Sequence, residues 1–413
     1  MTFQIIDKLN NIWVSGSPAP DAFGERNRRT RWDNIGNAIF WPFAVFIATH
    51  VLGVMAVNGN ATDDFSTVYY AVRRAVEGVP VYNETYFYVD PHYLYNPGAT
   101  LALFPLGMIA DFTTARTIFV LVNAIAIIGA LGLLTKVFGY SLRSFIWPAA
   151  IAAAFCTEAV QNTLIFSNIN GLLLLALVVF LWALLRKRNI LAGVVLGLAI
   201  LVKPLFAPLL FLPFVRFQWS TVGIGVIVPI AANIVAWPFI PGANDYVTRT
   251  MPYLGEVRDY ANSSLPGAAV YFGMPGWQKN IWFILFALAV IIALVFLLRY
   301  RHSEPLFWAC TTSGLLLTGV FFLSSLGQMY YSMLLFPLVF TVLLERSIMH
   351  SWLSWVAVYC FYSPTLWAWD DWQIYGRWVD LFRGTVGWGL ILLVTAVFSI
   401  ICWRREFNYT RSG

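Results

Sequence analysis

Charged residues are scarce in this chain of 413 residues, where Lys, Arg, Asp and Glu together make up 11%. Soluble globular domains carry about 25% charged residues. Because 59% of the chain is hydrophobic, the composition does not fit that class. Internal repeats, low-complexity tracts and a separate soluble domain are also lacking. The composition is that of a protein that crosses a membrane several times.

Cysteine is rare as well, and the four cysteines are Cys156, Cys310, Cys360 and Cys402. They lie in or beside apolar runs, without metal-ligand spacing and without a shared aqueous loop, so we expect free, buried thiols and no metal site. The net charge of +6 does not indicate nucleic-acid binding. Its arginines lie in short loops between apolar runs, where they report membrane topology. The polar first 33 residues have no apolar core, so we expect no signal peptide there.

A spanning helix needs about 20 apolar residues. The clearest runs that approach this length are 38–57, 114–136, 144–160, 168–186, 219–240, 279–299, 305–325, 329–345, 351–367 and 385–403. Basic loops are expected on the cytoplasmic side, and they occur at 26–31, 186–188, 299–301, 346 and 404–405. The polar stretches 58–96, 241–278 and 368–384 are then extracytoplasmic.

Two apolar segments do not fit this count as single spans. The run from 190 to 217 lies between two basic loops, so it must cross and return as two short helices, broken where Pro204 follows Lys203. The run 97–110 is short, and we expect a half-helix that re-enters the membrane from outside. The predicted fold is an all-α polytopic integral membrane protein with about twelve transmembrane helices, a re-entrant half-helix and an interfacial helix. Residues 1–37 and 404–413 form cytoplasmic tails around a membrane domain of residues 38–403.

The first outer loop, 58–96, is unusually polar and aromatic. Phe65, Val68 and Val72 recur at helical spacing, with Tyr69 on the opposite side, so the loop should hold a short amphipathic helix in the membrane interface. Asp63 and Asp64 precede it. One aspartate could simply cap the helix, but two in succession leave one for chemistry.

The end of this loop reads "YVDPHYLYNPG" and brings Asp90, His92, Tyr93 and Tyr95 together between prolines. An interfacial tyrosine belt with a surface histidine would explain this pattern. A substrate site would explain it as well, because His92 is one of only four histidines and an acid stands two residues before it.

Further polar residues interrupt apolar surroundings at the same predicted face. Lys203 stands at the helix break, where an intramembrane lysine suggests a functional site, although it could extend to the interface instead. Others are Asn168 and Asn170 in "QNTLIFSNING", Gln328, Tyr330 and Tyr331 in "SSLGQMYYS", and Arg258 in the second outer loop. Polar residues of this kind also join helices to one another. Their convergence on one face is what favours a site.

These motifs resemble those of the polyprenyl-phosphate-sugar glycosyltransferases of family 87, which belong to the GT-C superfamily of membrane enzymes. The resemblance rests on Asp-Phe-x-x-Val-Tyr-x-Ala at 64–71, Tyr-x-Tyr-x-Pro-Gly at 93–98 and the Lys-Pro break. The longer runs "YVDPHYLYNPG", "NTLIFSNING" and "RDYANSS", the last of which adds Asn262, resemble the branching α-1,3-arabinofuranosyltransferases of mycobacteria and corynebacteria. The resemblance covers about residues 38–400.

This resemblance implies an inverting enzyme that transfers arabinofuranose from decaprenylphosphoryl-β-D-arabinofuranose to the 3-hydroxyl of arabinan in arabinogalactan or lipoarabinomannan. It implies a carboxylate in the first outer loop as catalytic group, which selects Asp64 and Asp63. Cationic groups would bind the lipid phosphate, with Lys203, His92 and Arg258 as candidates. The polyprenyl phosphate leaves as an anion and needs no general acid, whereas the acceptor hydroxyl needs a general base. No cofactor is expected, and metal dependence stays open.

Two other interpretations remain. A polyprenyl-phosphate-mannose-dependent α-mannosyltransferase is possible within the same family. A lipid or sugar transporter would belong to a different class, but such proteins usually carry paired broken helices in two similar halves. This sequence has one clear break and no matching half.

Overall fold

The computed structural model describes residues 28–59, 64–86 and 92–411, with side chains as far as residue 404. Over these ranges the chain is helical, and its only β-type pairing is an isolated bridge between Arg28 and Tyr140. Six helical stretches in the described part are long and apolar enough to cross a membrane. The chain is therefore a polytopic helical membrane protein. These stretches are α2 to α3 (Asp33–Asn58), α6 (Phe112–Val137), α12 (Trp219–Ala236), α15 (Gly276–Leu297), α17 (Pro305–Leu323) and η7 with α20 (Asp370–Arg404 of a helix that continues to Arg411).

Shorter apolar helices fill the spaces between the long ones. They are α7 (Ile146–Phe155), α9 (Asn170–Leu185), α10 (Asn189–Val202), η2 with α11 (Pro204–Val215), η4 to η5 (Met329–Leu343) and α19 (Trp352–Tyr362). Helix α17 lies in the core, with Trp308 fully buried, whereas α12 and α15 lie at the periphery and expose apolar side chains such as Ile234, at 68%. Helices that are apolar all round suit contact with lipid on one side and protein on the other.

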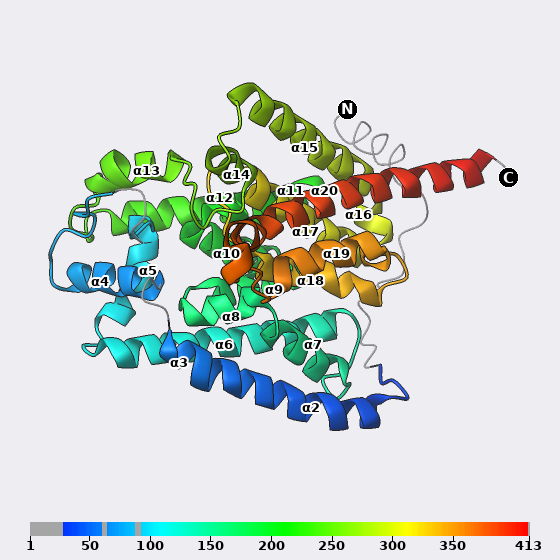
Figure 1. The fold of residues 1–413 in the computed structure, drawn as a ribbon, viewed down its shortest axis with the longest axis horizontal. Helices are drawn as coiled ribbons and strands as arrows, with labels where there is room; N and C mark the ends of the chain where they lie inside the picture. The colour runs from blue at the N-terminus through cyan, green and yellow to red at the C-terminus, as the bar shows by residue number, and fades with distance from the viewer. Residues whose placement is uncertain (1–27, 60–63, 87–91, 412–413) are drawn as a thin grey trace.

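The long helices share a rough common direction, with α2 and α6 along one edge of the molecule and α15 along the other (Figure 1). Helices α4 (Asp64–Val76), α5 (Pro97–Gly107) and α13 (Met251–Gly255) gather at one end. The last turns of α20 extend from the opposite end (Figure 1). Elements of the two large polar loops, 58–96 and 241–278, therefore lie at the same end of the molecule.

The amphipathic helix predicted in the first polar loop is present as α4, and Gly78 follows it with φ of 73°. Its apolar side is wider than the sequence indicated. Tyr69, expected on the polar side, is buried, and its hydroxyl can donate either to the carbonyl oxygen of Ile109 (2.8 Å) or to that of Ala110 (2.9 Å). These bonds fix α4 against the turn that follows α5.

The motif Asn96-Pro97-Gly98 starts α5 and inserts it between neighbouring helices. The Asn96 side chain accepts from the amide of Ala99 as the N-cap and also donates to the carbonyl oxygen of Leu201, at 2.6 Å. A Cβ atom on Gly98 would lie 3.0 Å from backbone atoms of Ala232 and Asn233 in α12, so only glycine allows this approach. With 11 residues, α5 is shorter than the roughly 20 residues of a spanning helix.

The predicted break between Lys203 and Pro204 is confirmed. Helix α10 ends at Val202, and the chain continues from Pro204 as the 3₁₀ segment η2 (Pro204–Leu210) and α11 (Phe211–Val215). The chain then returns to the level at which α10 began. Gln218 donates to the carbonyl oxygen of Leu184 (3.0 Å), and Thr221 donates to that of Asn189 (3.1 Å). The two arms therefore form the short hairpin that the sequence required.

Three expectations about the helices were wrong. The run 144–160 is not one helix, because Thr157 ends the first part and caps a second helix, α8 (Glu158–Ile165). The run 329–345 contains 3₁₀ segments on both sides of a five-residue α-helix. Helix α20 begins at Gln373, inside the expected loop 368–384. The four cysteines are free as expected, but only Cys310 is fully buried.

Candidate active site

Asp64 is the first residue of α4, and the helix start is bound to the end of α8. The Asp64 amide donates to the carbonyl oxygen of Phe166 at 2.8 Å, and the adjacent Phe65 is fully buried against Phe112 and Phe119. Aromatic packing of this kind holds the backbone at Asp64 in one place. The carboxylate is therefore fixed at the boundary between the first polar loop and the helical core.

The Asp64 carboxylate contacts a residue far away in the sequence. The hydroxyl of Tyr330 donates to Asp64 Oδ2 at 3.0 Å, and the same hydroxyl lies against Gln328 Oε1. Because a phenol has one proton, Tyr330 can donate to only one of these oxygens at a time. Gln328 and Tyr330, both predicted site residues, thus surround the predicted catalytic carboxylate.

The segment that carries these residues, η4 (Met329–Leu335), is held firmly by the core. Ser332 accepts at its hydroxyl from the Trp388 indole (2.9 Å) and at its carbonyl from the Tyr362 hydroxyl (3.0 Å). Both aromatic side chains are buried. The position of Tyr330 is therefore set by α19 and α20 rather than by a mobile loop.

Lys203 points from the helix break toward the same group of residues. Its Nζ donates to Asn170 Oδ1 at 2.8 Å and lies over the ring of Tyr331, 4.5 Å from the centroid. It is also 5.9 Å from the ring centroid of Tyr330 and interacts electrostatically with Asp64. The alternative in which Lys203 extends to the interface does not describe this conformation. The carboxylate and the ammonium group both contact the pair Tyr330–Tyr331.

Two buried amide groups lie next to the lysine and retain unused donors. Asn168 and Asn170 are 4% and 0% exposed, and neither side-chain Nδ2 has a hydrogen-bond acceptor among the described residues. Asn168 instead accepts at Oδ1 from the Asn170 amide, at 3.1 Å. Buried donors without an acceptor are costly. An acceptor that binds beside Lys203, such as a phosphate oxygen, would satisfy them.

Tyr95 completes this group from the first polar loop. It interacts electrostatically with Asp64 and Tyr331, and burial raises the pKa of its phenol well above the usual range. A phenol with a raised pKa stays neutral and can donate a hydrogen bond at neutral pH. We refer to Asp64, Tyr95, Asn168, Asn170, Lys203, Gln328, Tyr330 and Tyr331 together as the Asp64–Lys203 site.

His92 and Tyr93 belong to a neighbouring group instead. His92 is 6% exposed at its side chain, lies 3.4 Å from Glu84 and packs between the rings of Tyr86 and Tyr253. It is therefore not a surface histidine. Glu84 also accepts from Arg74 at 2.8 Å and from the Tyr93 amide at 3.2 Å. This ion-pair group holds the loop together.

Asn262 links the second polar loop to the site. Its Nδ2 donates to the carbonyl oxygens of Arg258 (2.9 Å) and Ser325 (2.8 Å), and its Oδ1 accepts from the amides of Gly327 (2.9 Å) and Ser264 (3.1 Å). Every hydrogen-bonding atom of the side chain is used within the protein. Asn262 therefore positions Gln328 rather than offering a free amide to a ligand.

Arg258 lies over the ring of Tyr253, 5.7 Å from the centroid, and interacts electrostatically with Tyr331. Asp63 and Asp90 lie outside the described residues.

One positioning residue was missed: Arg116 of α6 donates to the carbonyl oxygens of Ala56 (2.8 Å) and Ile165 (3.0 Å). It joins the start of α3 to the end of α8, next to Phe166, which anchors Asp64. Its position at the start of an apolar run was the available signal.

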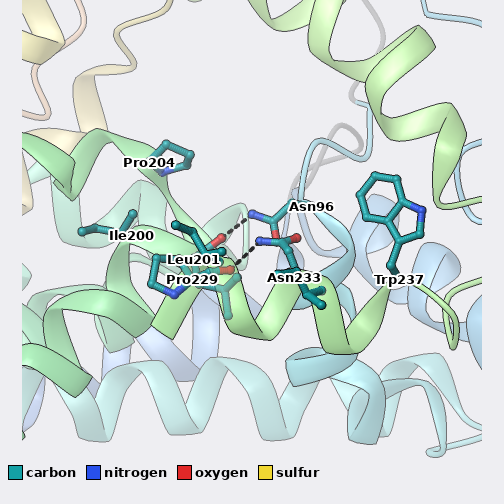
Figure 2. Close-up of a pocket in the computed structure, with 9 residues that line it drawn as sticks. Asn96, Ile200, Leu201, Pro204, Pro229, Asn233 and Trp237 are labelled. Atoms are coloured by element: carbon teal, nitrogen blue, oxygen red, sulfur yellow. Dashed lines mark hydrogen bonds between the residues drawn. The ribbon is translucent and has the colours of Figure 1, made fainter. Parts of the chain in front are cut away.

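A groove of about 570 Å³ lies beside the helix break. The residues that line it are Asn96 before α5, Ile200, Leu201 and Pro204 at the break, Pro229, Ile230, Asn233 and Ile234 in α12, and Trp237 directly after α12 (Figure 2). Ile230 and Ile234 are 54% and 68% exposed. The groove is thus an apolar surface feature. Pro204, which lines it, directly follows Lys203 in the sequence.

No group of three or more His, Cys, Asp or Glu side chains in the described part of the chain is arranged to hold a metal ion. The acidic and cationic members of the site are single residues surrounded by tyrosine and amide side chains. Chemically, this arrangement can accept a proton at the carboxylate and bind an anion at the ammonium group.

A helical membrane protein that holds a carboxylate and a lysine around one pair of tyrosines can act on an anionic substrate. The model of glycosyltransferase family 87 matches residues 93–325, which include Tyr95, Asn170 and Lys203. The chain belongs to this family and is a glycosyltransferase.

Several characterised relatives resemble it over most of their length. An α-(1→3)-arabinofuranosyltransferase of Corynebacterium glutamicum is 58% identical over 389 residues, which cover 94% of this chain and 93% of the relative. The enzymes of the same name from Mycolicibacterium smegmatis and Mycobacterium tuberculosis are 41% and 43% identical. Those matches cover 93% and 88% of this chain, and 90% and 84% of the relatives.

Proposed function

We propose that this protein transfers arabinofuranose from decaprenylphosphoryl-β-D-arabinofuranose to the 3-hydroxyl of an arabinan chain, and so creates α-1,3 branches in arabinogalactan or lipoarabinomannan. The observation that carries the proposal is that Asp64 and Lys203 both contact the Tyr330–Tyr331 pair, the carboxylate through the Tyr330 hydroxyl and the ammonium group over the two rings. The activity stated in the names of the relatives supports the choice of sugar and linkage.

In the proposed reaction, Asp64 is the general base. Its carboxylate takes the proton of the acceptor 3-hydroxyl while that oxygen attacks the anomeric carbon of the donor and the bond to the phosphate oxygen breaks. One displacement converts a β donor into an α product, so no second nucleophilic carboxylate is required. Tyr330 holds the carboxylate in position through its hydroxyl, at 3.0 Å.

The departing polyprenyl phosphate is an anion, and cations and donors that face it lower the barrier. Lys203 supplies the charge, and Asn168 and Asn170 supply donors that have no acceptor in the described part of the chain. The prenyl chain would lie in the apolar groove at Pro204 and α12, because the residue after the phosphate-binding lysine lines that groove. The proposed mechanism uses no metal ion or other cofactor.

We also propose a membrane arrangement. It has about twelve membrane segments, because the shorter apolar helices also enter the bilayer. Helix α5 is a re-entrant half-helix in this arrangement. Residues 1–37 and 404–413 would be cytoplasmic tails, and the site would face the extracytoplasmic side of the bacterial plasma membrane. The positive-inside pattern supports this orientation. In a variant without native cysteines, Glu77→Cys should react with a membrane-impermeant reagent in intact cells, and Lys187→Cys only after permeabilisation. The opposite pattern would refute the orientation.

The function is tested with purified protein, the arabinose lipid donor and a synthetic arabinan acceptor, followed by analysis of the linkage formed. Asp64→Asn should reduce kcat about 100- to 10,000-fold, the contribution of a general base, while the melting temperature stays close to that of the wild type. Asp111→Asn is the matched control, because Asp111 caps α6 through the Thr114 amide and asparagine caps equally well. Consumption of a mannose lipid donor instead would assign the protein to the mannosyltransferases of the family.

A further inference from the structure

An unusual row of aromatic side chains lies at the start of α20. Trp369, Trp372, Tyr375 and Trp378 recur at every third position, and Phe272 extends the row from the second polar loop. Successive ring centroids are 5.0, 6.3, 5.3 and 5.5 Å apart. We call these five residues the aromatic ladder.

The ladder is exposed, which distinguishes it from the core. Its five side chains are 50%, 41%, 57%, 37% and 48% exposed, in the order from Trp369 to Phe272. Single exposed aromatic residues are ordinary, but contiguous ones on a membrane protein face either the lipid interface or a ligand. The Asp64–Lys203 site does not account for any of them.

The ladder stands on a rigid base. Asp380 accepts from the amide of Trp367 at 3.0 Å, and Arg383 donates to the carbonyl oxygen of Thr365 at 2.9 Å and pairs with Glu158. Gly376 lies directly against the Trp367 backbone, where a side chain would not fit. These contacts hold Thr365 and Trp367 against α20, so the rings keep a fixed relative position.

Two hydrogen-bonded steps connect this base to the reaction centre. Ser263 donates to the carbonyl oxygen of Leu381 (2.9 Å) and accepts at its own carbonyl from Thr385 (2.6 Å). The adjacent Asn262 accepts from the Gly327 amide at 2.9 Å, next to Gln328. The ladder therefore has a defined position relative to the residues that surround Asp64.

The chemistry of the ladder fits a glycan. Aromatic faces pack against the C–H faces of sugar rings while remaining partly hydrated. The exposed carboxylates of Asp370 and Asp371 can accept hydrogen bonds from sugar hydroxyls. Segments that bind anionic membranes are rich in Lys and Arg, whereas residues 369–378 contain two acids and only one basic residue, Arg377. The charges favour a neutral, hydroxyl-rich ligand over lipid.

We propose that the aromatic ladder binds the acceptor glycan at sugar units distant from the hydroxyl that reacts. This inference rests on the proposed function, because it assumes that the acceptor is a polysaccharide. The ladder would make a long acceptor bind more tightly than a short one without altering the chemical step. It would thereby select the position along the chain at which a branch is added.

The test compares an arabinofuranosyl disaccharide with a linear oligoarabinofuranoside several times longer. The double variant Trp372→Ala/Tyr375→Ala should raise KM for the long acceptor about 10-fold, since each aromatic contact contributes about 2- to 10-fold. The KM for the disaccharide, the KM for the donor and kcat should stay at wild-type values. Trp372→Phe should retain most of the preference. Trp352→Ala, which removes a side chain 71% exposed at the start of α19, is the matched control and should change nothing.

Unchanged KM for the long acceptor would overturn the proposal. An equal loss of activity with both acceptors would also overturn it, and would indicate that the rings contact lipid or maintain the fold. If the wild type transfers arabinose to neither acceptor, the proposed function fails, but the ladder can still be tested. Isothermal titration calorimetry of the long oligosaccharide into protein in lipid nanodiscs should then show binding that the double variant weakens, and equal binding by both proteins would refute the inference.

Discussion

Replacing Lys203 with methionine removes one ammonium group and keeps a flexible side chain of similar length. The wild-type ammonium donates to Asn170 Oδ1 at 2.8 Å and lies 4.5 Å from the ring centroid of Tyr331. If it also binds the donor phosphate, the variant loses a charge-assisted hydrogen bond in the complex. We therefore expect weaker donor binding together with a modest loss of stability.

The two effects have different magnitudes. A hydrogen bond to a charged group contributes about 1.5–3 kcal/mol, which corresponds to a roughly 10- to 150-fold rise in the dissociation constant of the donor. The loss of stability comes from Asn170, whose buried oxygen is left without a donor at a cost of about 1–3 kcal/mol, and from the lost contacts with the Tyr330 and Tyr331 rings. The variant should still fold and insert, because this cost is smaller than the net stability of about 5–15 kcal/mol that is typical of folded proteins.

The assay measures donor binding directly, in nanodiscs and without acceptor, by calorimetric titration with the arabinose lipid. A second variant, Lys203→Gln, can still donate to Asn170 but carries no charge. It should recover most of the stability and little of the affinity. Arg216→Gln is a control for the removal of a cation elsewhere, because Arg216 lies over the ring of Trp308 rather than in the site.

Wild-type donor affinity in Lys203→Met would refute the assignment and leave the lysine a purely structural role. Recovery of donor affinity in Lys203→Gln would show that hydrogen bonding, and not charge, holds the phosphate.

Three further substitutions separate chemistry from positioning. Tyr330→Phe should lower kcat about 10- to 150-fold, less than Asp64→Asn, because it removes one hydrogen bond to the carboxylate; an unchanged rate would exclude Tyr330 from the mechanism. Asn262→Ala should lower the free energy of unfolding by about 1–3 kcal/mol, because it leaves buried backbone groups unpaired, and a melting temperature equal to wild type would contradict this. Gly98→Val should destabilise the protein by about 1–3 kcal/mol through overpacking against α12. Gly78→Ala changes only the backbone conformation and should lower the melting temperature less than Gly98→Val. A larger loss in Gly78→Ala would refute the argument that Gly98 is needed for the close approach.

Local sequence patterns predicted the elements that local physics determines. Helix α4 follows from the spacing of its apolar residues, and the break after Lys203 follows from proline, which cannot donate to the helix ladder. Tyr69 was assigned to the wrong side because a tyrosine can be polar at its hydroxyl and apolar elsewhere. Whether the tyrosine hydroxyl faces water or the protein depends on partners such as Ile109 and Ala110, which are 40 and 41 residues away in the sequence. No local pattern indicates them.

The division of the run 144–160 shows another limit. Its composition is that of one spanning helix, yet Thr157 caps a new helix and Glu158 pairs with Arg383, 225 residues away. A glutamate is tolerated in such surroundings only with a partner. Because Arg383 lies near the other end of the chain, the sequence indicated that burial of Glu158 is unfavourable but did not identify its partner.

The same reasoning explains how far the site could be predicted. Asp64, Lys203 and the "SNIN" asparagines were recognisable one by one, since each is costly in apolar surroundings unless it has a partner or a ligand. Their shared face followed from topology. Their pairing did not, because the bond between Asp64 and Tyr330 joins residues 266 positions apart. His92 and Asn262 shared the same signals, yet the partners that the fold provides use His92 within an ion-pair group and Asn262 within a backbone network. A polar residue in an apolar run therefore predicts that a partner exists. Only the fold determines whether that partner is the protein or its substrate, and the unpaired donors of Asn168 and Asn170 are the features here that point to substrate.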